Sequence, residues 1–365
     1  MTVSNDVVHD PRVLKEAHAL QEAGHGVSII GWDRSGTAKR REELNGLHIY
    51  RVRTDGVMRV LPKDMFRLPL WWRRARALAR SIPFDVVHSH DLDTLPIGVR
   101  LKKATGRPLI YDAHEVFEDV IEGDVPQLVI DITHRLELRL APQADRVITV
   151  TDGVKKHVDR VSGKEAVIVR NCHDLYIDAY RPPPAYPFTV LYIGVLHPSR
   201  FITQAIDVIG GMPDVRLPIA GAGQLTRIVQ AMCAEHPNTN FLGLVPLERV
   251  LPMTLDSHAV LIMSDPTLRL SKIGLSNKMF DAMVTGRPVI VTKGVPMGDI
   301  VTHEECGIAV PYTKEGFRSA VERLRDDPAL AERMGRNGLA AAKREYNWGA
   351  EKKKLLAVYE SLPGR

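Results

Sequence analysis

Short apolar runs alternate with longer amphipathic stretches along the 365 residues of the chain. Several of these runs are apolar enough to be buried on both faces, as the strands of a parallel sheet are. The stretch 11–24 has the periodicity of a helix and ends at Gly24, a residue type that commonly ends helices. Alternation of this kind predicts doubly wound α/β domains. The runs that we interpret as strands are 27–31, 48–52, 85–89, 108–111, 146–150, 166–169, 188–194, 215–221, 240–245, 258–263 and 288–291.

A proline-rich segment divides this pattern into two halves. Residues 180–187 contain four prolines, which excludes a helix or a central strand and favours a stiff linker. The length of the chain also fits two domains of roughly 150–180 residues each. We therefore predict an N-terminal domain over 1–178, a linker over 179–187 and a C-terminal domain over 188–346. A last helix within 347–365 is expected to pack on either domain, and one alternative is that it crosses back to the first.

The composition is that of an ordinary globular protein, with 44% hydrophobic and 25% charged residues. No apolar run is long enough to span a membrane, and the N-terminus lacks the pattern of a signal peptide. Cys172, Cys233 and Cys306 lie far apart and show no C-x-x-C spacing, so we expect neither a disulfide scaffold nor a zinc site. These features favour a cytoplasmic protein.

Basic residues are concentrated in the segment 59–80, which holds seven of them, one acidic residue, and the pair Trp71 and Trp72. One interpretation is a helix whose aromatic side chains pack on the N-terminal domain. The other is an interfacial segment, in which tryptophan settles at the level of the lipid headgroups and basic residues are attracted to an anionic membrane at its inner face. Both interpretations stay open at this point. We expect no nucleic-acid partner.

Polar residues gather directly after the predicted strands. Because ligands of doubly wound domains bind at the carboxyl ends of the strands, two such domains would present these residues to a shared cleft. The candidates from the first half are His90, Asp91, His114, Glu115 and Asn171, and those from the second half are Gly194, Arg200, Gly221, Gly223, Ser276, Asn277, Lys278 and Asp281.

Some of these residues have simpler explanations. The pair His88 and His90 has a spacing that is compatible with a metal ion. We expect one of the two side chains to be taken up by the sheet, because strand residues alternate between its faces, and we predict no metal site. Gly221 and Gly223 lack the full G-x-G-x-x-G pattern, and such a pair is more typical of a tight turn before a helix.

Lys278 carries the clearest chemical signal of the second half. Ser276 or Asn277 is a natural N-cap, so Lys278 falls in the first turn of a helix, where the dipole disfavours a cation by up to ~1 kcal/mol. A solvated lysine that tolerates this penalty is one explanation. A bound anion is the other, since free N–H groups and an ammonium together form a phosphate site. Arg200 favours the same anion, and Asp281 can accept hydrogen bonds from sugar hydroxyls. A nucleotide-diphosphate sugar suits this combination.

Seven stretches carry a resemblance to a known family: "NDVVHDPRVLKEAHALQEAGHGVSII", "VVHSHDLDTL", "IYDAHE", "ADRVITVTDGV", "VRNCHD", "LYIGVLHPSR" and "LSNKMFDAMVTGRPVIV". Over nearly its full length the chain resembles the family-4 retaining glycosyltransferases of the GT-B fold. The last stretch is the most specific, because it is similar to a P/S-N-K-L-F-E motif of one branch. The resemblance implies an α/β architecture in which two Rossmann-like doubly wound domains face a central cleft.

The resemblance also assigns roles to single residues. It implies that His90 lies near the transferred sugar, that Arg200 holds the diphosphate and that Asp281 binds the ribose as a shortened version of a glutamate. Lys278 and the helix start before it would supply further contacts to the diphosphate. Asn171 matches the first position of an N-x-x-D turn that ends the first domain.

Three features depart from the family pattern. Val195 stands where an arginine often follows the preceding glycine, and Ile273 stands where the family has the first of two acids. The first strand of the family normally precedes a loop that begins here at Ser4, with Asn5 and Asp6 on the acceptor side. Only residues 1–3 precede that loop.

The implied function is transfer of a sugar, with retention, from a nucleotide-diphosphate sugar to an acceptor hydroxyl in the synthesis of a surface polysaccharide or glycolipid. No cofactor and no metal are expected, and the partners are the donor and a glycan or lipid-linked acceptor. A GT-B-fold sugar-nucleotide epimerase and a non-catalytic sugar-nucleotide-binding protein are the alternatives. The assigned residues are His90, Arg200 and Lys278 for catalysis; Gly194, Gly221, Gly223, Ser276, Asn277 and Asp281 for the donor; and Asn5, Asp6, Asp91, His114, Glu115 and Asn171 for the acceptor or cleft.

Overall fold

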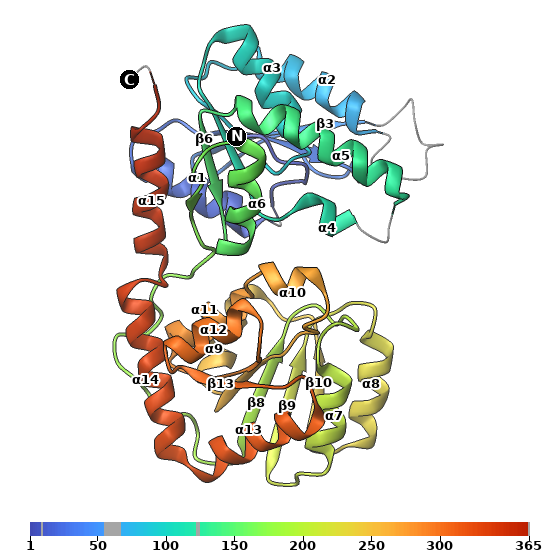
Figure 1. The fold of residues 1–365 in the computed structure, drawn as a ribbon, viewed down its shortest axis with the longest axis vertical. Coiled ribbons are helices and arrows are strands. Elements are labelled where there is room, and N and C mark those ends of the chain that lie inside the picture. The colour runs from blue at the N-terminus through green and yellow to red at the C-terminus, as the bar shows by residue number, and fades with distance from the viewer. Residues whose placement is uncertain (9, 55–66, 122–124, 364–365) are drawn as a thin grey trace. The chain divides into compact units, whose positions relative to one another are not determined.

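The computed structural model describes residues 1–8, 10–54, 67–121 and 125–363. The chain divides into two compact units, which we treat separately (Figure 1). Unit 1 comprises Met1–Arg170 together with Lys352–Arg365, and unit 2 comprises Asn171–Glu351. Residues 171–178, which we expected in the first domain, therefore belong to unit 2. Helix α15 (Trp348–Glu360) begins in unit 2 and ends in unit 1.

Unit 1 is built on a mainly parallel sheet. Thr2 forms parallel bridges to Ile30 and to Ser89, so residues 1–3 join the strand set β2-β3-β1 to the set β4-β5-β6-β7. This short segment takes the place of the first strand that the family pattern requires. Only β2 is antiparallel to its neighbour. The strands are β1 (Ser28–Asp33), β2 (Arg41–Leu44), β3 (Leu47–Arg53), β4 (Val87–His90), β5 (Leu109–Ala113), β6 (Arg146–Thr149) and β7 (Val167–Ile168).

Two helices of unit 1, α1 and α6, begin at residues whose side chains cap them. The side chain of Asp10 accepts a hydrogen bond from the backbone N–H of Val13, and Pro11 occupies the first position of α1, where its missing N–H costs nothing. Thr151 caps α6 in the same way by accepting from Val154. The helices are α1 (Pro11–Glu22), α2 (Leu68–Ala79), α3 (Leu95–Thr105), α4 (Phe117–Ile121), α5 (Gln127–Leu140) and α6 (Asp152–Ser162).

Helix α2 contains the described part of the basic segment, and residues 59–66 lie outside the described residues. Trp71 is fully buried and stacks on Trp32 of β1 at a ring distance of 5.4 Å. The indole N–H of Trp72 donates to the carbonyl oxygen of Asp93 at 2.6 Å. Both tryptophans therefore serve the packing of unit 1, which agrees with the interpretation as a packed helix, and contact of the segment with a membrane stays a prediction.

Unit 2 contains a six-stranded parallel sheet in the order β10-β9-β8-β11-β12-β13. Its strands are short, apolar and buried, which is typical of a sheet covered by helices on both faces. The strands are β8 (Phe188–Ile193), β9 (Val215–Ala220), β10 (Thr239–Gly243), β11 (Ala259–Ile262), β12 (Val289–Thr292) and β13 (Gly307–Val310). The helices are α7 (Ile202–Gly210), α8 (Thr226–Glu235), α9 (Val250–Leu255), α10 (Arg269–Ile273), α11 (Asn277–Thr285), α12 (Pro296–His303), α13 (Lys314–Asp326) and α14 (Pro328–Arg344).

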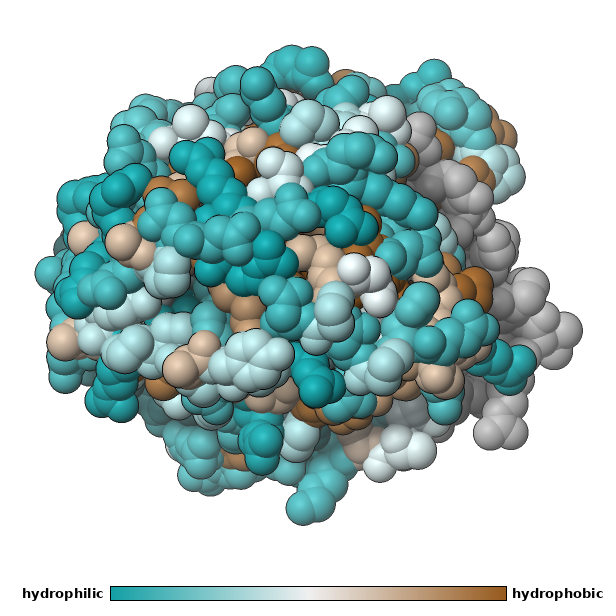
Figure 2. Space-filling view, turned by 90° about the horizontal axis from the view of Figure 1, so that it is seen from below, coloured by the Kyte–Doolittle hydropathy of each residue, from teal (hydrophilic) through white to brown (hydrophobic). Residues whose placement is uncertain are grey.

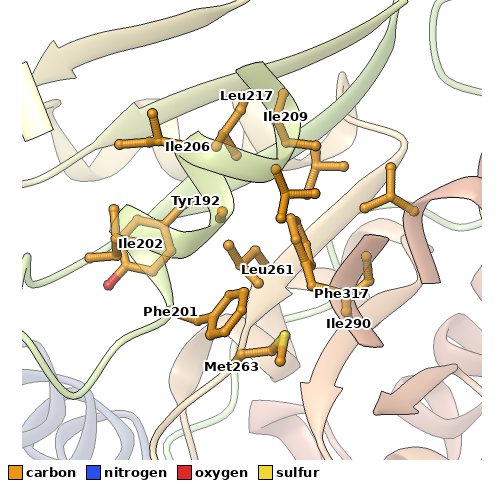
Figure 3. Close-up of a cluster of buried hydrophobic side chains, with 14 of the residues drawn as sticks. Tyr192, Phe201, Ile202, Ile206, Ile209, Leu217, Leu261, Met263, Ile290 and Phe317 are labelled. Atoms are coloured by element: carbon orange, nitrogen blue, oxygen red, sulfur yellow. The ribbon is translucent and has the colours of Figure 1, made fainter. Parts of the chain in front are cut away.

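The core of unit 2 gathers side chains from β8, β9, β11 and β12 and from the helices α7 and α13 (Figure 3). Tyr192 and Phe201 belong to this core, and Phe201 meets Phe317 edge to face at 5.7 Å. The face drawn in Figure 2 is covered mostly by hydrophilic residues, with hydrophobic ones between them in small groups. Within the described part of the chain, no helix combines the length and the apolarity needed to cross a bilayer.

Candidate functional site

The start of helix α11 has the arrangement that the sequence predicts. Ser276 is the N-cap residue, but its side chain makes no capping hydrogen bond. Asn277 is exposed, and Lys278 is the second residue of the helix. Met279 N–H donates to the carbonyl of Ser276 at 3.0 Å, and the N–H groups before it lie at the positive end of the helix dipole, so this end of α11 carries positive charge even without the lysine.

The side chain of Lys278 packs against the end of β8. Its Nζ is 4.0 Å from the centroid of the Tyr192 ring, and Tyr192 itself is a buried core residue. A Cβ atom at Gly194 would lie 2.9 Å from both Cε and Nζ of Lys278, so this position must be glycine if the lysine is to stay in place. Lys278 forms no ion pair with any described residue, and its ammonium is left without a counter-ion.

The environment of Lys278 disfavours its charge. Burial and, secondly, the nearby guanidinium of Arg200 lower the pKa of Lys278 to about 7, against a smaller opposing effect of Asp281. Two cations that repel each other at the positive end of a helix form a site that an anion stabilises. We name Gly194, Arg200, Ser276, Asn277 and Lys278 the cation cluster.

Affinity of the cation cluster for a diphosphate should depend on pH. Because the charged form of Lys278 attracts the anion and its neutral form does not, bound diphosphate raises the pKa of Lys278, and binding takes up a proton above pH 7. We expect the affinity for UDP to be nearly constant between pH 6.5 and 7 and then to fall, approaching a tenfold loss per pH unit. Calorimetric titrations between pH 6.5 and 8.5 measure this. Lys278→Arg keeps its charge over the whole range, so a slope that persists in that variant would contradict the explanation.

Gly221 and Gly223 follow β9 with φ angles of 138° and 158°, which favour glycine. A Cβ at Gly221 would lie 1.9 Å from the carbonyl oxygen of Gly194, and one at Gly223 would lie 2.4 Å from that of Leu196. Leu196 N–H donates to the carbonyl of Ala222 at 3.0 Å. The two glycines thus let the loop after β9 pack directly against the loop after β8.

Asp281 lies one turn further along α11 and is largely buried. Its Oδ1 is 3.0 Å from Nε2 of His173, which belongs to the same unit. His173 lies in the stretch "VRNCHD", and no role was predicted for this residue. The partner was missed because 108 positions separate the two residues (281 minus 173) and no local pattern links them.

His88 and His90 lie on the same face of β4 and stack at a ring distance of 4.3 Å. Both are buried. The argument that alternation between the faces of the sheet separates the two side chains is wrong, because residues two apart on a strand share a face. Nδ1 of His90 lies 3.3 Å from Asp112 and 3.3 Å from His114, while its Nε2 has no hydrogen-bond partner among the described residues.

A network of buried charges surrounds these rings. Nη2 of Arg12 lies 2.8 Å from Glu16 and 3.2 Å from both carboxylate oxygens of Asp112. Burial alone would raise the pKa of Asp112, but Arg12 and His114 hold it well below its usual value. Burial lowers the pKa of His90, with a further contribution from His88, so this ring is neutral at pH 7. We name Arg12, Glu16, His88, His90, Asp112 and His114 the histidine cluster.

The loops after β4 and β5 meet, as the sequence predicts. Asp91 accepts a hydrogen bond from the backbone N–H of His114 at 2.9 Å, and its other oxygen lies 3.2 Å from Nδ1 of that ring. Asp91 and Asp112 outweigh burial and raise the pKa of His114 well above its usual value. Glu115 is exposed beside them. The structure thus joins His90, Asp91 and His114 in one group that carries both a neutral and a charged imidazole.

The other residues that we predicted for the acceptor or the cleft contact different parts of the chain. The side chain of Asn5 bonds to Asp10 and to the backbone of Val7, each at 2.8 Å, and so shapes its own loop. The carbonyl of Asp6 accepts from Arg51 at 2.7 Å. Asn171 is the first residue of unit 2 rather than part of unit 1.

Four members of the histidine cluster have the spacing of metal ligands: in Glu16, His88, His90 and Asp112 the ligand atoms lie within 4.8 Å of one another. The Arg12 guanidinium already supplies positive charge to both carboxylates of this group. A second set with the same spacing is Glu118, Glu137 and His157, in which Glu137 bonds to Tyr111 at 3.0 Å and to His157 at 2.8 Å.

Two families of known proteins match the chain in succession. The family described as Glycosyltransferase Family 4 matches residues 12–176, and the family described as Glycosyl transferases group 1 matches residues 187–327. Glycogen synthase from Mycobacterium tuberculosis is 24% identical over 358 residues, which cover 90% of this chain and 85% of that protein.

Solved structures share the fold. Sucrose-phosphate synthase from Thermosynechococcus elongatus superimposes with a TM-score of 0.79 at 19% identity, covering 95% of this chain and 92% of that one. The Anabaena protein Alr3699/HepE, crystallised with UDP and glucose, gives a TM-score of 0.75 at 14% identity, covering 99% and 98%. The chain therefore belongs to the family-4 glycosyltransferases of the GT-B fold. The predicted fold class, with two Rossmann-like units, is confirmed.

Proposed function

We propose that this glycosyltransferase moves a sugar from a nucleotide-diphosphate donor to an acceptor hydroxyl with retention, in the synthesis of a surface polysaccharide or glycolipid. One observation carries the proposal: a half-buried lysine that forms no ion pair with any residue the structure describes stands in the first turn of α11, near Arg200. Such a site costs free energy while it is empty and is stabilised by a diphosphate. The Anabaena protein supports the choice of ligand, since its structure contains UDP and glucose.

In the proposed reaction the bond between the anomeric carbon and the diphosphate oxygen breaks, and the acceptor oxygen bonds to that carbon on the same face. The acceptor proton passes to the departing diphosphate, so no protein nucleophile is needed. Lys278 and Arg200 stabilise the charge that develops on the leaving group, and His90 contacts the transferred sugar. Asp281, which lies 3.0 Å from His173, accepts from the ribose. No cofactor takes part.

A product assay tests this function. The chain is incubated with UDP-, GDP- and dTDP-sugars and with candidate glycan and glycolipid acceptors, and released nucleoside diphosphate and glycosylated product are measured together. Acceptor-dependent release with an anomeric configuration equal to that of the donor is the expected result. An epimerised donor without a glycosylated product would identify an epimerase instead, and binding without turnover would identify a non-catalytic protein.

We further propose that unit 1 contacts an anionic membrane on its cytoplasmic side through the basic residues of α2. With both tryptophans packed inward, charge alone drives this contact, through side chains such as Arg73 and Arg76. Each basic residue near an anionic surface contributes ~1 kcal/mol, so replacing both by serine should weaken binding to anionic vesicles roughly 30-fold. Co-sedimentation at low salt measures this, with Arg323 and Arg333 of unit 2 changed to serine as the control. Binding that survives the α2 change would contradict the proposal.

A further inference from the structure

Four arginines surround a cavity of about 460 Å³ in unit 1 that the proposed reaction does not use. We call this cavity the arginine pocket. Val52 is the other lining residue, and the guanidinium groups come from Arg40, Arg51, Arg53 and Arg74. Like charges gathered in one cavity repel each other, so such an arrangement requires either compensating acids or an anionic ligand.

Local structure fixes the four side chains. Arg51 and Arg53 are two residues apart on β3 and therefore share a face. Arg40 directly precedes β2, and its carbonyl accepts from the backbone N–H of Arg51 at 2.8 Å. Arg74 of α2 donates from its guanidinium to the carbonyl of Arg53 at 2.5 Å. The pocket is thus built from three adjoining elements.

The compensation by acids is incomplete. Arg51 pairs with Glu42 at 2.8 Å, and Arg53 pairs with Asp33 at 2.7 Å. Arg40 and Arg74 form no ion pair with any described residue, which leaves two charges uncompensated.

Arg51 adds a second, independent observation. Its side chain is only 1% exposed, yet its Nη2 atom has no hydrogen-bond acceptor among the residues that the structure describes. A buried donor without an acceptor costs roughly 1–3 kcal/mol, unless a ligand supplies the acceptor. The pocket therefore offers an unsatisfied buried donor as well as unbalanced positive charge.

We propose that the arginine pocket binds a phosphate group of the acceptor. Guanidinium groups match the oxygen atoms of phosphate in geometry and charge, and two uncompensated charges fit a dianion. This inference rests on the proposed function and on the expectation that the N-terminal part of the chain holds the acceptor.

The position of the pocket in the sheet allows an estimate of its distance from His90. Arg53 ends β3, at the same edge of the sheet at which His90 ends β4. Three strand spacings separate β3 from β4, through β1 and the segment 1–3, which is roughly 14 Å at about 4.8 Å per spacing. The acceptor is then a phosphorylated glycan or glycolipid whose phosphate lies about that far from the hydroxyl that receives the sugar.

Titration with pyrophosphate tests the proposal on the full chain. Saturating UDP is added first, so that the donor site is occupied. Arg40→Glu reverses one uncompensated charge of an exposed side chain, and the matched control Arg41→Glu makes the same change one residue later, where the side chain lies over Tyr50 outside the pocket. We expect pyrophosphate affinity to fall at least tenfold in Arg40→Glu and to stay unchanged in Arg41→Glu. Arg74→Gln should show a smaller loss.

The outcomes separate this inference from the proposed function. Equal affinities in Arg40→Glu and in wild type, or an equal loss in both Glu variants, would overturn the inference. A loss in Lys278→Ala alone would also overturn it, since the anion would then occupy the cation cluster. If UDP itself does not bind, the proposed function fails. The comparison of pyrophosphate affinity in Arg40→Glu and Arg41→Glu then still tests whether the arginine pocket binds an anion. Tighter binding to vesicles with phosphatidic acid than to pyrophosphate supports a lipid-linked phosphate, and the reverse order supports a soluble one.

Discussion

Alanine at position 278 or 200 is expected to weaken the binding of a nucleoside diphosphate by roughly 10- to 150-fold. Each substitution removes a charge-assisted hydrogen bond worth ~1.5–3 kcal/mol to the anion. The melting temperature should not fall with the affinity for Lys278→Ala, because the free protein keeps this ammonium half-buried near Arg200 and, among the described residues, without an ion-pair partner. We expect an unchanged or slightly raised melting temperature together with the lost affinity.

Calorimetry with UDP and a thermal melt measure both quantities on the same samples. Lys272→Ala is the matched control, because Lys272 is an exposed lysine of the preceding helix α10. It should leave the affinity unchanged. Wild-type affinity in both Lys278→Ala and Arg200→Ala would show that neither residue holds the diphosphate.

Asparagine in place of Asp112 should cost unit 1 about 3–5 kcal/mol, as breaking a buried ion pair does. The change is nearly isosteric but leaves the buried Arg12 guanidinium with Glu16 as its remaining carboxylate. It also removes the negative charge that lies 3.0 Å from His114 and 3.3 Å from His90. We therefore expect loss of transfer activity even under conditions in which the variant stays folded.

Urea denaturation followed by tryptophan fluorescence measures this cost. Three of the four tryptophans lie in unit 1, namely Trp32, Trp71 and Trp72, so the signal reports mainly on that unit. Asp85→Asn is the control, because Asp85 forms an exposed pair with Arg107 at 3.3 Å, and such pairs are worth about 0–1 kcal/mol. Equal small losses in the two variants would contradict a structural role of the buried network.

The fold was largely predictable because buried parallel strands are marked by continuous apolar runs. Each predicted run overlaps an observed strand, and the ends differ by at most two residues. Strand β2 was missed, since its sequence Arg-Glu-Glu-Leu lies at the edge of the sheet and carries no apolar pattern. Its signal was the Asn45-Gly46 turn, in which both residues have positive φ and which is typical of hairpins. Strand β13 was also missed, although its run of four residues is as long as others that were predicted.

The candidate site was predictable only where local rules act. Cap chemistry and the dipole placed Lys278 in the first turn of α11, and strand ends placed His90, Asp91 and His114 in one group. Arg12 gave no local signal for its pairing with Asp112, which is 100 residues away in the chain. The same holds for the arginine pocket, whose members come from separate elements. Pairings of this kind depend on tertiary packing, and one sequence does not encode them in any short pattern.

The central claim is that the cation cluster of unit 2 recognises the diphosphate of a nucleotide donor. Comparing UDP with UMP, GDP with GMP and dTDP with dTMP in calorimetric titrations at pH 7 tests it most directly, since each pair shares its base and ribose. Our account predicts that for the preferred base the diphosphate binds at least tenfold more tightly than the monophosphate, and that Lys278→Ala abolishes most of the difference. Equal affinities within every pair, or no binding of any of the six nucleotides, would contradict it.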